Sequence, residues 1–176
     1  MVENQDSYVQ SSSVLLLSRI RRNHGLEHAT LNVLSRRFPD APLAGHSDFN
    51  GFWILGNVTP DDLSSAVQEA LARLQKGEAG LAIHPGCGTN YATTGILAGT
   101  AAAIAMFGAG RRVRDWLERL PFAAMLATLA VIASQPVGLA VQARLTTSGS
   151  PGTLQVVKIT HSQKGRVSAF RIITQG

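Results

Sequence analysis

The sequence predicts an α+β amino-terminal domain followed by a two-helix transmembrane hairpin and a carboxy-terminal β-hairpin. Three observations carry this prediction. Apolar residues recur at helical spacing in residues 13–37. No Asp, Glu, Lys or Arg occurs in residues 79–110 or 120–143, although the chain has a net charge of +5. Two short runs rich in β-branched residues flank a turn near the carboxyl end.

The amino-terminal domain is expected over residues 13–90, after a disordered polar tail at residues 1–12. A long helix over residues 13–37 opens the domain, because its apolar residues fall near one face. Two short extended segments, residues 43–47 and 51–58, follow across a turn. The order of these elements indicates a mixed domain of helices and strands.

The next helix has clear start and stop signals. Thr59 is suited to cap its amino end, Pro60 takes the first helical position, and Gly77 supplies the stop. The expected buried stripe consists of Leu63, Val67, Ala70 and Leu74. Residues 80–85 are predicted to form a short strand that leads into a Gly-rich turn.

The carboxyl end is predicted to return to β structure. Residues 143–153 contain Ser, Gly and Pro and are expected to be a linker. Residues 154–176 are expected to form a β-hairpin around the turn at 162–165. We expect this hairpin to dock onto the amino-terminal domain.

Residues 91–142 are predicted to form the transmembrane hairpin. The segments 91–110 and 120–142 each provide about the 20 apolar residues that a membrane-spanning helix needs. The turn between them is rich in arginine and carries Trp116, as an interfacial turn would. The alternative is a buried helical hairpin in a soluble protein.

The expected partner of these segments is the lipid bilayer. Gly95 and Gly99 form a G-x-x-x-G pattern, which permits close approach of helices and predicts a homo-oligomer contact. Nucleic acid is not an expected partner, because the basic clusters lack interleaved aromatic residues. The predicted location is the cell membrane, with a multi-pass chain.

The orientation in the membrane rests on two opposing signals. The arginines of the central turn favour a cytoplasmic turn, which would place both termini outside. The polar, acidic start of the chain is not a secretory signal, and the lone cysteine suits a reducing compartment. We favour a cytoplasmic amino-terminal domain.

The stretch "RRNHGLEHAT" contains His24, Glu27 and His28 in an H-x-x-E-H spacing. Residues four apart lie on one helix face, so the two imidazoles can reach the same zinc ion. Glu27 would then take a proton from a water activated by that ion. Gly25 costs the helix roughly 1 kcal/mol against Ala, which suggests that another backbone or a substrate comes close. The alternative is that both histidines are hydrogen-bonded core residues.

The turn "HPGCGTN" provides candidates for further ligands. His84 and Cys87 are three residues apart, and imidazole and thiolate both bind zinc. Four protein ligands would make a closed structural site, whereas three would leave a position for water. The alternative is a turn leading into the membrane, with Thr89 and Asn90 capping the next helix. Weaker substitutes for the missing ligand are Glu69 and Glu78.

Two family resemblances rest on these motifs. The pairing of "HGLEHAT" with "AIHPGCGTN" resembles an uncharacterised family of small bacterial membrane proteins, over most of the chain. More remotely, residues 20–76 resemble the inverted zincins, the insulinase and pitrilysin type of metallopeptidase. That resemblance implies zinc ligation by His24 and His28 and general-base catalysis by Glu27. It departs from the family where a later helix should supply a glutamate ligand.

The sequence therefore predicts a membrane-anchored, zinc-dependent hydrolase, a peptidase that acts on a polypeptide near the bilayer. The competing prediction is a non-catalytic integral membrane protein of structural or interaction role, with a structural metal or none. The two differ in whether the metal keeps an open position beside Glu27.

Overall fold

A computed structural model of the chain describes the backbone of residues 3–164 and 167–176, and the side chains of residues 15–163 and 168–176. The chain divides into two compact units. Met1–His84 and Ala143–Gly176 together form the first, which we call the α/β unit. Pro85–Gln142 form the second, which we call the helical unit. The long apolar segments thus interrupt the α/β unit in the sequence.

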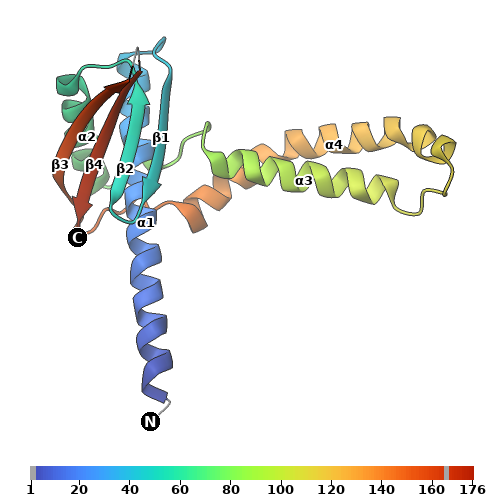
Figure 1. Cartoon of the computed structure of the whole chain (residues 1–176), viewed down its shortest axis with the longest axis horizontal. Helices are drawn as coiled ribbons and strands as arrows, with labels where there is room; N and C mark the ends of the chain where they lie inside the picture. The colour runs from blue at the N-terminus through green and yellow to red at the C-terminus, as the bar shows by residue number, and fades with distance from the viewer. Residues whose placement is uncertain (1–2, 165–166) are drawn as a thin grey trace. The chain divides into compact units, whose positions relative to one another are not determined.

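The α/β unit begins with a long helix, α1, which spans Glu3–Arg37 (Figure 1). The helix starts ten residues before the expected position, so the segment expected to be a disordered tail is helical from Glu3. No Pro or Gly occurs between residues 3 and 24 to interrupt the helix. The carboxyl end falls where the sequence predicts it, because Pro39 disfavours helical geometry in the residue before it.

A four-stranded antiparallel sheet lies beside α1, in the order β1-β2-β4-β3 (Figure 1). The strands are β1 Leu43–Asp48, β2 Gly51–Gly56, β3 Gln155–Lys164 and β4 Val167–Gln175. The predicted terminal hairpin is confirmed, and the two extended segments predicted after α1 pair with each other as well. The terminal hairpin joins the first one through pairing of β2 with β4, which sets Ile54 opposite Phe170. The mixed α and β composition of the fold is therefore confirmed.

The second helix, α2, spans Pro60–Gln75 and has the predicted cap. The Asp62 amide donates to the Thr59 hydroxyl at 3.1 Å, which satisfies one of the amides that the helix start leaves exposed. Gly77 follows the helix with a φ of +92°, a conformation that favours glycine. The four predicted stripe residues are all buried.

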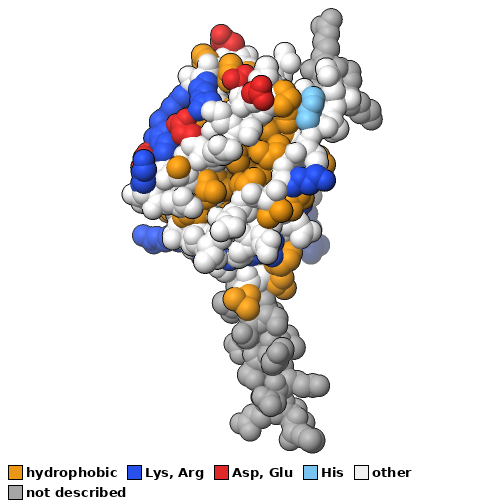
Figure 2. All heavy atoms as spheres, turned by 90° about the vertical axis from the view of Figure 1, so that its left-hand side faces the viewer, with side chains coloured by type: hydrophobic (Ala, Val, Ile, Leu, Met, Phe, Trp, Pro, Cys, Tyr) orange, Lys and Arg blue, Asp and Glu red, His pale blue; other side chains and the backbone are white. Residues whose placement is uncertain are grey.

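The core of the α/β unit lies between the two helices and one face of the sheet. Phe52 and Ile54 of β2, and Phe170 and Ile172 of β4, are fully buried against α1 and α2. The other face of β2 exposes Trp53 and Leu55. Acidic and basic side chains lie together along one edge of the unit (Figure 2). The α/β unit therefore has an apolar interior, and the face in Figure 2 has hydrophobic side chains at its centre as well as charged ones at its edge.

The predicted strand at residues 80–85 is wrong. Ala79–Ala82 form a short 3-10 helix, η1, instead. The Asn32 side chain of α1 donates to the carbonyl oxygens of Leu81 and Ile83, at 2.9 and 3.0 Å. These carbonyl groups accept from a helix side chain rather than from a neighbouring strand, which is why the segment does not join the sheet.

The helical unit consists of α3, Gly88–Met106, and α4, Val113–Val141, which run side by side (Figure 1). Polar pairs lie between them. Thr94 and Ser134 share a hydrogen bond of 2.7 Å between their hydroxyl groups, and the Gln142 amide donates to Asn90 Oδ1 at 2.6 Å. A π-helical turn, η2, continues α4 over Gln142–Thr146.

Among the described residues, one helical stretch is long and apolar enough to span a membrane, Val113–Thr146. Only 11% of its most apolar window is buried, so its apolar side chains face outward. The helix α3, rich in Ala, Gly and Thr, does not meet the same criterion. Two helices form where two were expected, but the findings support one candidate span, and a multi-pass arrangement is not supported.

The G-x-x-x-G pattern does not form the contact between α3 and α4. In the described structure, a Cβ atom added at Gly95 or Gly99 would meet nothing within 4 Å beyond its own helix. The close approach occurs instead at Gly138, where an added Cβ would lie 2.6 Å from Asn90 Oδ1. The face with Gly95 and Gly99 is thus not used in packing these two helices.

Candidate metal centre

Three histidines predicted as ligands gather in the α/β unit. His24 and His28 lie one turn apart on α1, with ring centroids 4.3 Å apart. His84 follows η1, and its ring centroid lies 5.8 Å from that of His28. His28 is almost fully buried, whereas His24 and His84 are half-buried. His28 therefore lies near both of the other imidazoles, but among the described residues His84 does not join His24 and His28 in a group whose ligand atoms all lie within 4.8 Å of one another.

Each of these imidazoles has its Nδ1 atom bound to an oxygen acceptor. His24 Nδ1 lies 2.9 Å from the Thr146 carbonyl oxygen, and His28 Nδ1 lies 2.8 Å from that of Ala82. His84 Nδ1 lies 2.9 Å from Oδ1 of Asn32. A carbonyl oxygen accepts and never donates, so in every case Nδ1 carries the proton.

This protonation leaves the Nε2 atom of each ring with the lone pair. Histidines that bind metals almost always donate their other ring N–H to a carbonyl or carboxylate oxygen, which fixes the tautomer and the ring orientation. His24, His28 and His84 share this arrangement. Each of the three imidazoles thus has the donor chemistry of a zinc ligand, since zinc binds neutral imidazole nitrogen.

Glu27 directly precedes His28 in the sequence, and the residue is buried, with 4% exposed. Its carboxylate packs under β1, where a Cβ atom added at Gly45 would lie 2.3 Å from Oε1. Gly45 therefore provides the space that the carboxylate occupies.

The glycine inside the motif has the role that the sequence predicts. A Cβ atom added at Gly25 would lie 2.0 Å from the Ser148 carbonyl oxygen. Another stretch of backbone does come close at this point. The Ser148 amide also donates to the Arg21 carbonyl oxygen at 2.9 Å. A residue with a side chain at position 25 would push this loop away from α1.

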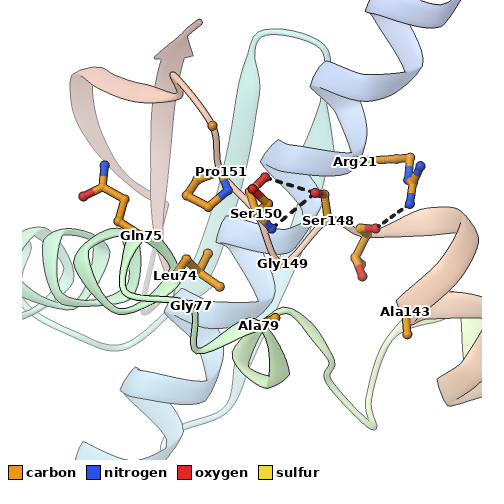
Figure 3. Close-up of a pocket in the computed structure, with 12 residues that line it drawn as sticks. Arg21, Leu74, Gln75, Gly77, Ala79, Ala143, Ser148, Gly149, Ser150 and Pro151 are labelled. Carbon is orange, nitrogen blue, oxygen red and sulfur yellow. Dashed lines mark hydrogen bonds between the residues drawn. The ribbon is translucent and has the colours of Figure 1, made fainter.

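Arg21 fixes the loop that orients His24. Its guanidinium donates to the carbonyl oxygens of Arg144 and Thr147, at 2.9 and 3.1 Å. A pocket of about 540 Å³ adjoins the same loop, with Arg21, Ser148 and Ser150 in its wall (Figure 3). Ser148 and Ser150 bond to each other there, which further shapes the loop. The Thr146 carbonyl is thus held in place on both sides.

Cys87 belongs to the helical unit, where it caps the amino end of α3. Its Sγ atom accepts from the Thr89 amide at 3.4 Å, and the residue is 7% exposed. The turn caps the helix, as the alternative interpretation expects, but through Cys87. Asn90 instead donates to the Pro85 carbonyl oxygen. The thiol of Cys87 is a donor of a type that binds zinc.

The weaker candidates, Glu69 and Glu78, belong to surface ion pairs. Glu69 accepts from Arg37 and from Arg73, and Glu78 accepts from Arg73 at 2.6 Å. The hydrogen bond from Arg37 lowers the pKa of Glu69, and that from Arg73 lowers the pKa of Glu78. Both carboxylates are therefore paired with arginines, and no metal ion is needed to balance their charge.

Two groups that lie at the candidate centre were not identified from the sequence. Asn32 lies one turn beyond His28 on the same face of α1, so its helical spacing could have indicated it. Thr146 contributes through its backbone carbonyl from 122 positions further along the chain. No sequence pattern marks a carbonyl, because every residue has one.

The chain belongs to the family described as "Domain of unknown function (DUF6391)", whose model matches residues 19–159. An uncharacterized protein of Picosynechococcus sp. (strain ATCC 27264 / PCC 7002 / PR-6) is 45% identical over 87 residues. That match covers 44% of this chain and 42% of the relative, so the chain matches less than half of the relative's length. No solved structure matches.

These matches confirm membership of an uncharacterised family. The matched range includes the H-x-x-E-H helix, η1 and the turn with Cys87. They give no support to the resemblance to inverted-zincin metallopeptidases. Any activity must therefore be argued from the residues themselves.

Proposed function

We propose that this protein is a membrane-anchored zinc protein with hydrolytic activity. The observation that carries the proposal is the pair of imidazoles on α1, His24 and His28, whose ring centroids lie 4.3 Å apart and whose Nδ1 atoms both donate to backbone carbonyl oxygens. His84, whose ring centroid lies 5.8 Å from that of His28, is the proposed third ligand. Three imidazoles are a ligand set of catalytic zinc sites, in which the fourth position binds water or substrate. The outward-facing apolar side chains of α4 support the membrane anchor.

Glu27 is the proposed general base. Zinc lowers the pKa of a bound water toward about 7, so a carboxylate is a sufficient base at neutral pH. Glu27 is held beneath Gly45 next to His28, which limits the positions that its carboxylate can take. The substrate proposed from the H-x-x-E-H spacing is a polypeptide near the bilayer, and this finer assignment rests on the motif alone.

The competing proposal is a structural metal in a non-catalytic membrane protein. The turn that carries His84 also carries Cys87, which could bind as a fourth ligand. A four-ligand centre has no position for water, and Glu27 would then serve only to balance charge. The role of Cys87 therefore separates the two functions.

Metal analysis of the full-length protein in detergent tests the centre. We expect about one zinc per chain by elemental mass spectrometry in the wild type, and its loss in His28→Ala and in His84→Ala. The exposed His46 is the matched control, so His46→Ala should keep its zinc. A wild-type protein that contains no zinc and takes none up contradicts the proposal.

The same measurement on Cys87→Ala separates the two functions. Retained zinc indicates an open centre, and Glu27→Gln should then keep the metal but lose hydrolysis of fluorescent peptide substrates. Zinc lost in Cys87→Ala indicates a closed centre and favours the structural role. Equal peptide hydrolysis in wild type and Glu27→Gln contradicts the role of Glu27 as base.

The proposed location is the cell membrane, with the α/β unit in the cytoplasm. A second copy of the chain is a proposed partner through the face of α3 with Gly95 and Gly99, which small residues leave open to close helix approach. Replacing both glycines by Leu should shift the oligomeric state measured by light scattering in detergent. An unchanged mass contradicts this contact.

A further inference from the structure

The pocket beside α1 carries a positive charge that no acidic side chain balances. It has a volume of about 540 Å³, and every described residue that lines it belongs to the α/β unit (Figure 3). Arg21 lies in its wall, and none of the described lining residues is Asp or Glu. Arg21 forms no ion pair within the part of the chain that the structure describes. The pocket therefore favours a negatively charged ligand.

The guanidinium group of Arg21 keeps hydrogen-bonding capacity for such a ligand. Its bonds to the carbonyl oxygens of Arg144 and Thr147 both use Nη2. Nε of Arg21 is buried and has no hydrogen-bond partner among the described residues. A buried N–H without an acceptor is unfavourable. An oxyanion at this guanidinium would therefore satisfy bonds that the protein itself leaves open.

The loop that follows η2 adds a neutral hydrogen-bond donor to the pocket wall. Ser150 is exposed, and its two bonds to Ser148 use its backbone amide and carbonyl, so its hydroxyl group takes part in neither. Gly149 lies against η1, where an added Cβ atom would be 2.5 Å from the Ala79 side chain. Gly152 has a φ of +57°, which favours glycine. These two glycines let the loop turn closely over η1, and the Ser150 hydroxyl group can bind a ligand.

The chemistry and the size of the pocket indicate a phosphate group on a small organic molecule. Arginine binds phosphate through charge-assisted hydrogen bonds, and a serine hydroxyl group is a further donor. The pocket volume of about 540 Å³ falls within the range of roughly 300–1,000 Å³ for ligand pockets. This volume is larger than a single phosphate ion requires. Leu74 and Pro151 provide apolar wall for the remainder of the ligand.

The pocket also lies at the end of the candidate membrane span. That span is Val113–Thr146, and Ala143, near its carboxyl end, lines the pocket. The headgroups of a bilayer lie outside its hydrocarbon core, where such a span ends. A phospholipid headgroup is therefore one source of the phosphate group, and a soluble phosphoester is the other.

We infer that this pocket binds a phosphoester, with its phosphate group at the Arg21 guanidinium and the Ser150 hydroxyl group. The inference goes beyond the proposed zinc centre and does not depend on it, because no described histidine lines the pocket.

The test is the binding of sn-glycerol 3-phosphate to the full-length protein in detergent, measured by isothermal titration calorimetry. We expect Arg21→Gln to weaken binding by about 10- to 100-fold, the effect of losing a hydrogen bond to a charged group. Ser150→Asp should weaken binding by a similar factor, because it places a negative charge in the pocket wall. This second variant leaves both bonds of Arg21 to the loop in place, so its effect does not depend on a released loop.

Two matched controls accompany these variants. Ser150→Asn has the size of Ser150→Asp without its charge. Arg36→Gln changes the net charge by the same amount as Ser150→Asp, at an exposed residue that does not line this pocket. Both controls should stay within about threefold of wild type. Equal losses in Ser150→Asp and Arg36→Gln would indicate unspecific attraction and overturn the inference, and so would unchanged binding in Ser150→Asp.

Native mass spectrometry of the same proteins distinguishes the two sources of the phosphate group. The probes are phosphatidic acid and diacylglycerol, which lacks the phosphate group. Phosphatidic acid that binds to wild type and Ser150→Asn but not to Ser150→Asp assigns the ligand to a lipid headgroup. Binding of glycerol 3-phosphate without phosphatidic acid assigns it to a soluble phosphoester. A wild type that binds neither overturns the inference, whereas a wild type that binds one of them but no zinc overturns only the proposed function.

Discussion

The two units of this protein place their apolar side chains in opposite ways. In the α/β unit, Phe52, Phe170 and Ile172 are fully buried. In the helical unit, the large apolar residues point outward, and Ile96 and Ile132 are 68% and 66% exposed. Burial of apolar surface stabilises a domain in water. The exposed apolar surface of the helical unit would be unfavourable in water, and an apolar solvent removes that cost.

Polar side chains show the reverse pattern. Ser134 and Gln142 of the helical unit are buried at the contact between its helices, where they bond to Thr94 and Asn90. Helices in lipid gain little from apolar burial against each other, so small residues and hydrogen bonds hold them together. One chain thus contains two kinds of packing, an apolar interior in the α/β unit and buried polar pairs with outward apolar side chains in the helical unit.

Removal of a buried aromatic ring should affect only the α/β unit strongly. Phe170→Ala should lower the free energy of unfolding by about 3–5 kcal/mol, because it leaves a cavity in the core. Phe122, on α4, is 50% exposed, and Phe122→Ala should cost less than about 0.5 kcal/mol. Denaturant unfolding in detergent measures both, followed by Trp53 fluorescence in a Trp116→Phe background for the α/β unit and by Trp116 fluorescence in a Trp53→Phe background for the helical unit. Equal costs would contradict the difference in packing.

A charge on the outward face of α4 should affect membrane association. Leu129 is 55% exposed near the middle of α4. Leu129→Arg should disfavour insertion by about 2.5–3.5 kcal/mol, the cost of an arginine at the centre of a bilayer. The fraction of protein retained in membranes after alkaline extraction should fall. Leu55→Arg, on the exposed face of β2, is the control, and equal retention of both variants would mean that α4 does not lie in lipid.

Added methyl groups should have opposite effects in the two units. Gly25→Ala should destabilise the α/β unit by about 1–3 kcal/mol, because the new Cβ atom meets the Ser148 carbonyl oxygen. Gly95→Ala should stabilise α3 by about 0.5–1 kcal/mol, because alanine favours the helix. Thermal unfolding of the two variants in detergent measures both changes. A Gly95→Ala variant that is destabilised as a monomer would contradict the open space at this position within one chain.

The smallest expected effect concerns a surface ion pair of the sheet. Arg171 donates to Asp48 at 2.8 Å, and this hydrogen bond lowers the pKa of Asp48. A lowered folded pKa means that the contribution to stability is present above the ordinary pKa near 4 and is lost as the pH falls through the folded value. Because Asp48 is partly exposed, Asp48→Asn should cost only about 0.2–1 kcal/mol at pH 7.

Unfolding at two pH values checks this prediction. The difference between wild type and Asp48→Asn should be present at pH 7 and should shrink as the pH falls below about 4. The exposed Arg114–Glu118 pair of α4 is the comparison in the other unit. Glu118→Gln should change stability by no more than about 0.5 kcal/mol. A difference for Asp48→Asn that grows at low pH would contradict the assignment.

The elements that could be predicted from the sequence are those with local signals. The 3.6-residue period set His24 and His28 on one face of a helix, and Thr59, Pro60 and Gly77 marked both ends of α2. Short turns fixed the two hairpins. The run of apolar residues in α4 marked the candidate membrane span. Each of these signals acts between residues that are close in the chain, so a pattern can reveal it.

Contacts between segments far apart in the chain could be recognised only in the three-dimensional structure. The pairing of β2 with β4 joins residues more than 110 positions apart, and His24 bonds to a carbonyl group 122 positions away. Residues 79–82 form a 3-10 helix beside α1 because Asn32 binds the carbonyl groups of Leu81 and Ile83. Such contacts depend on which backbone groups the whole fold brings into reach. Every residue carries those groups, so the sequence alone does not distinguish them.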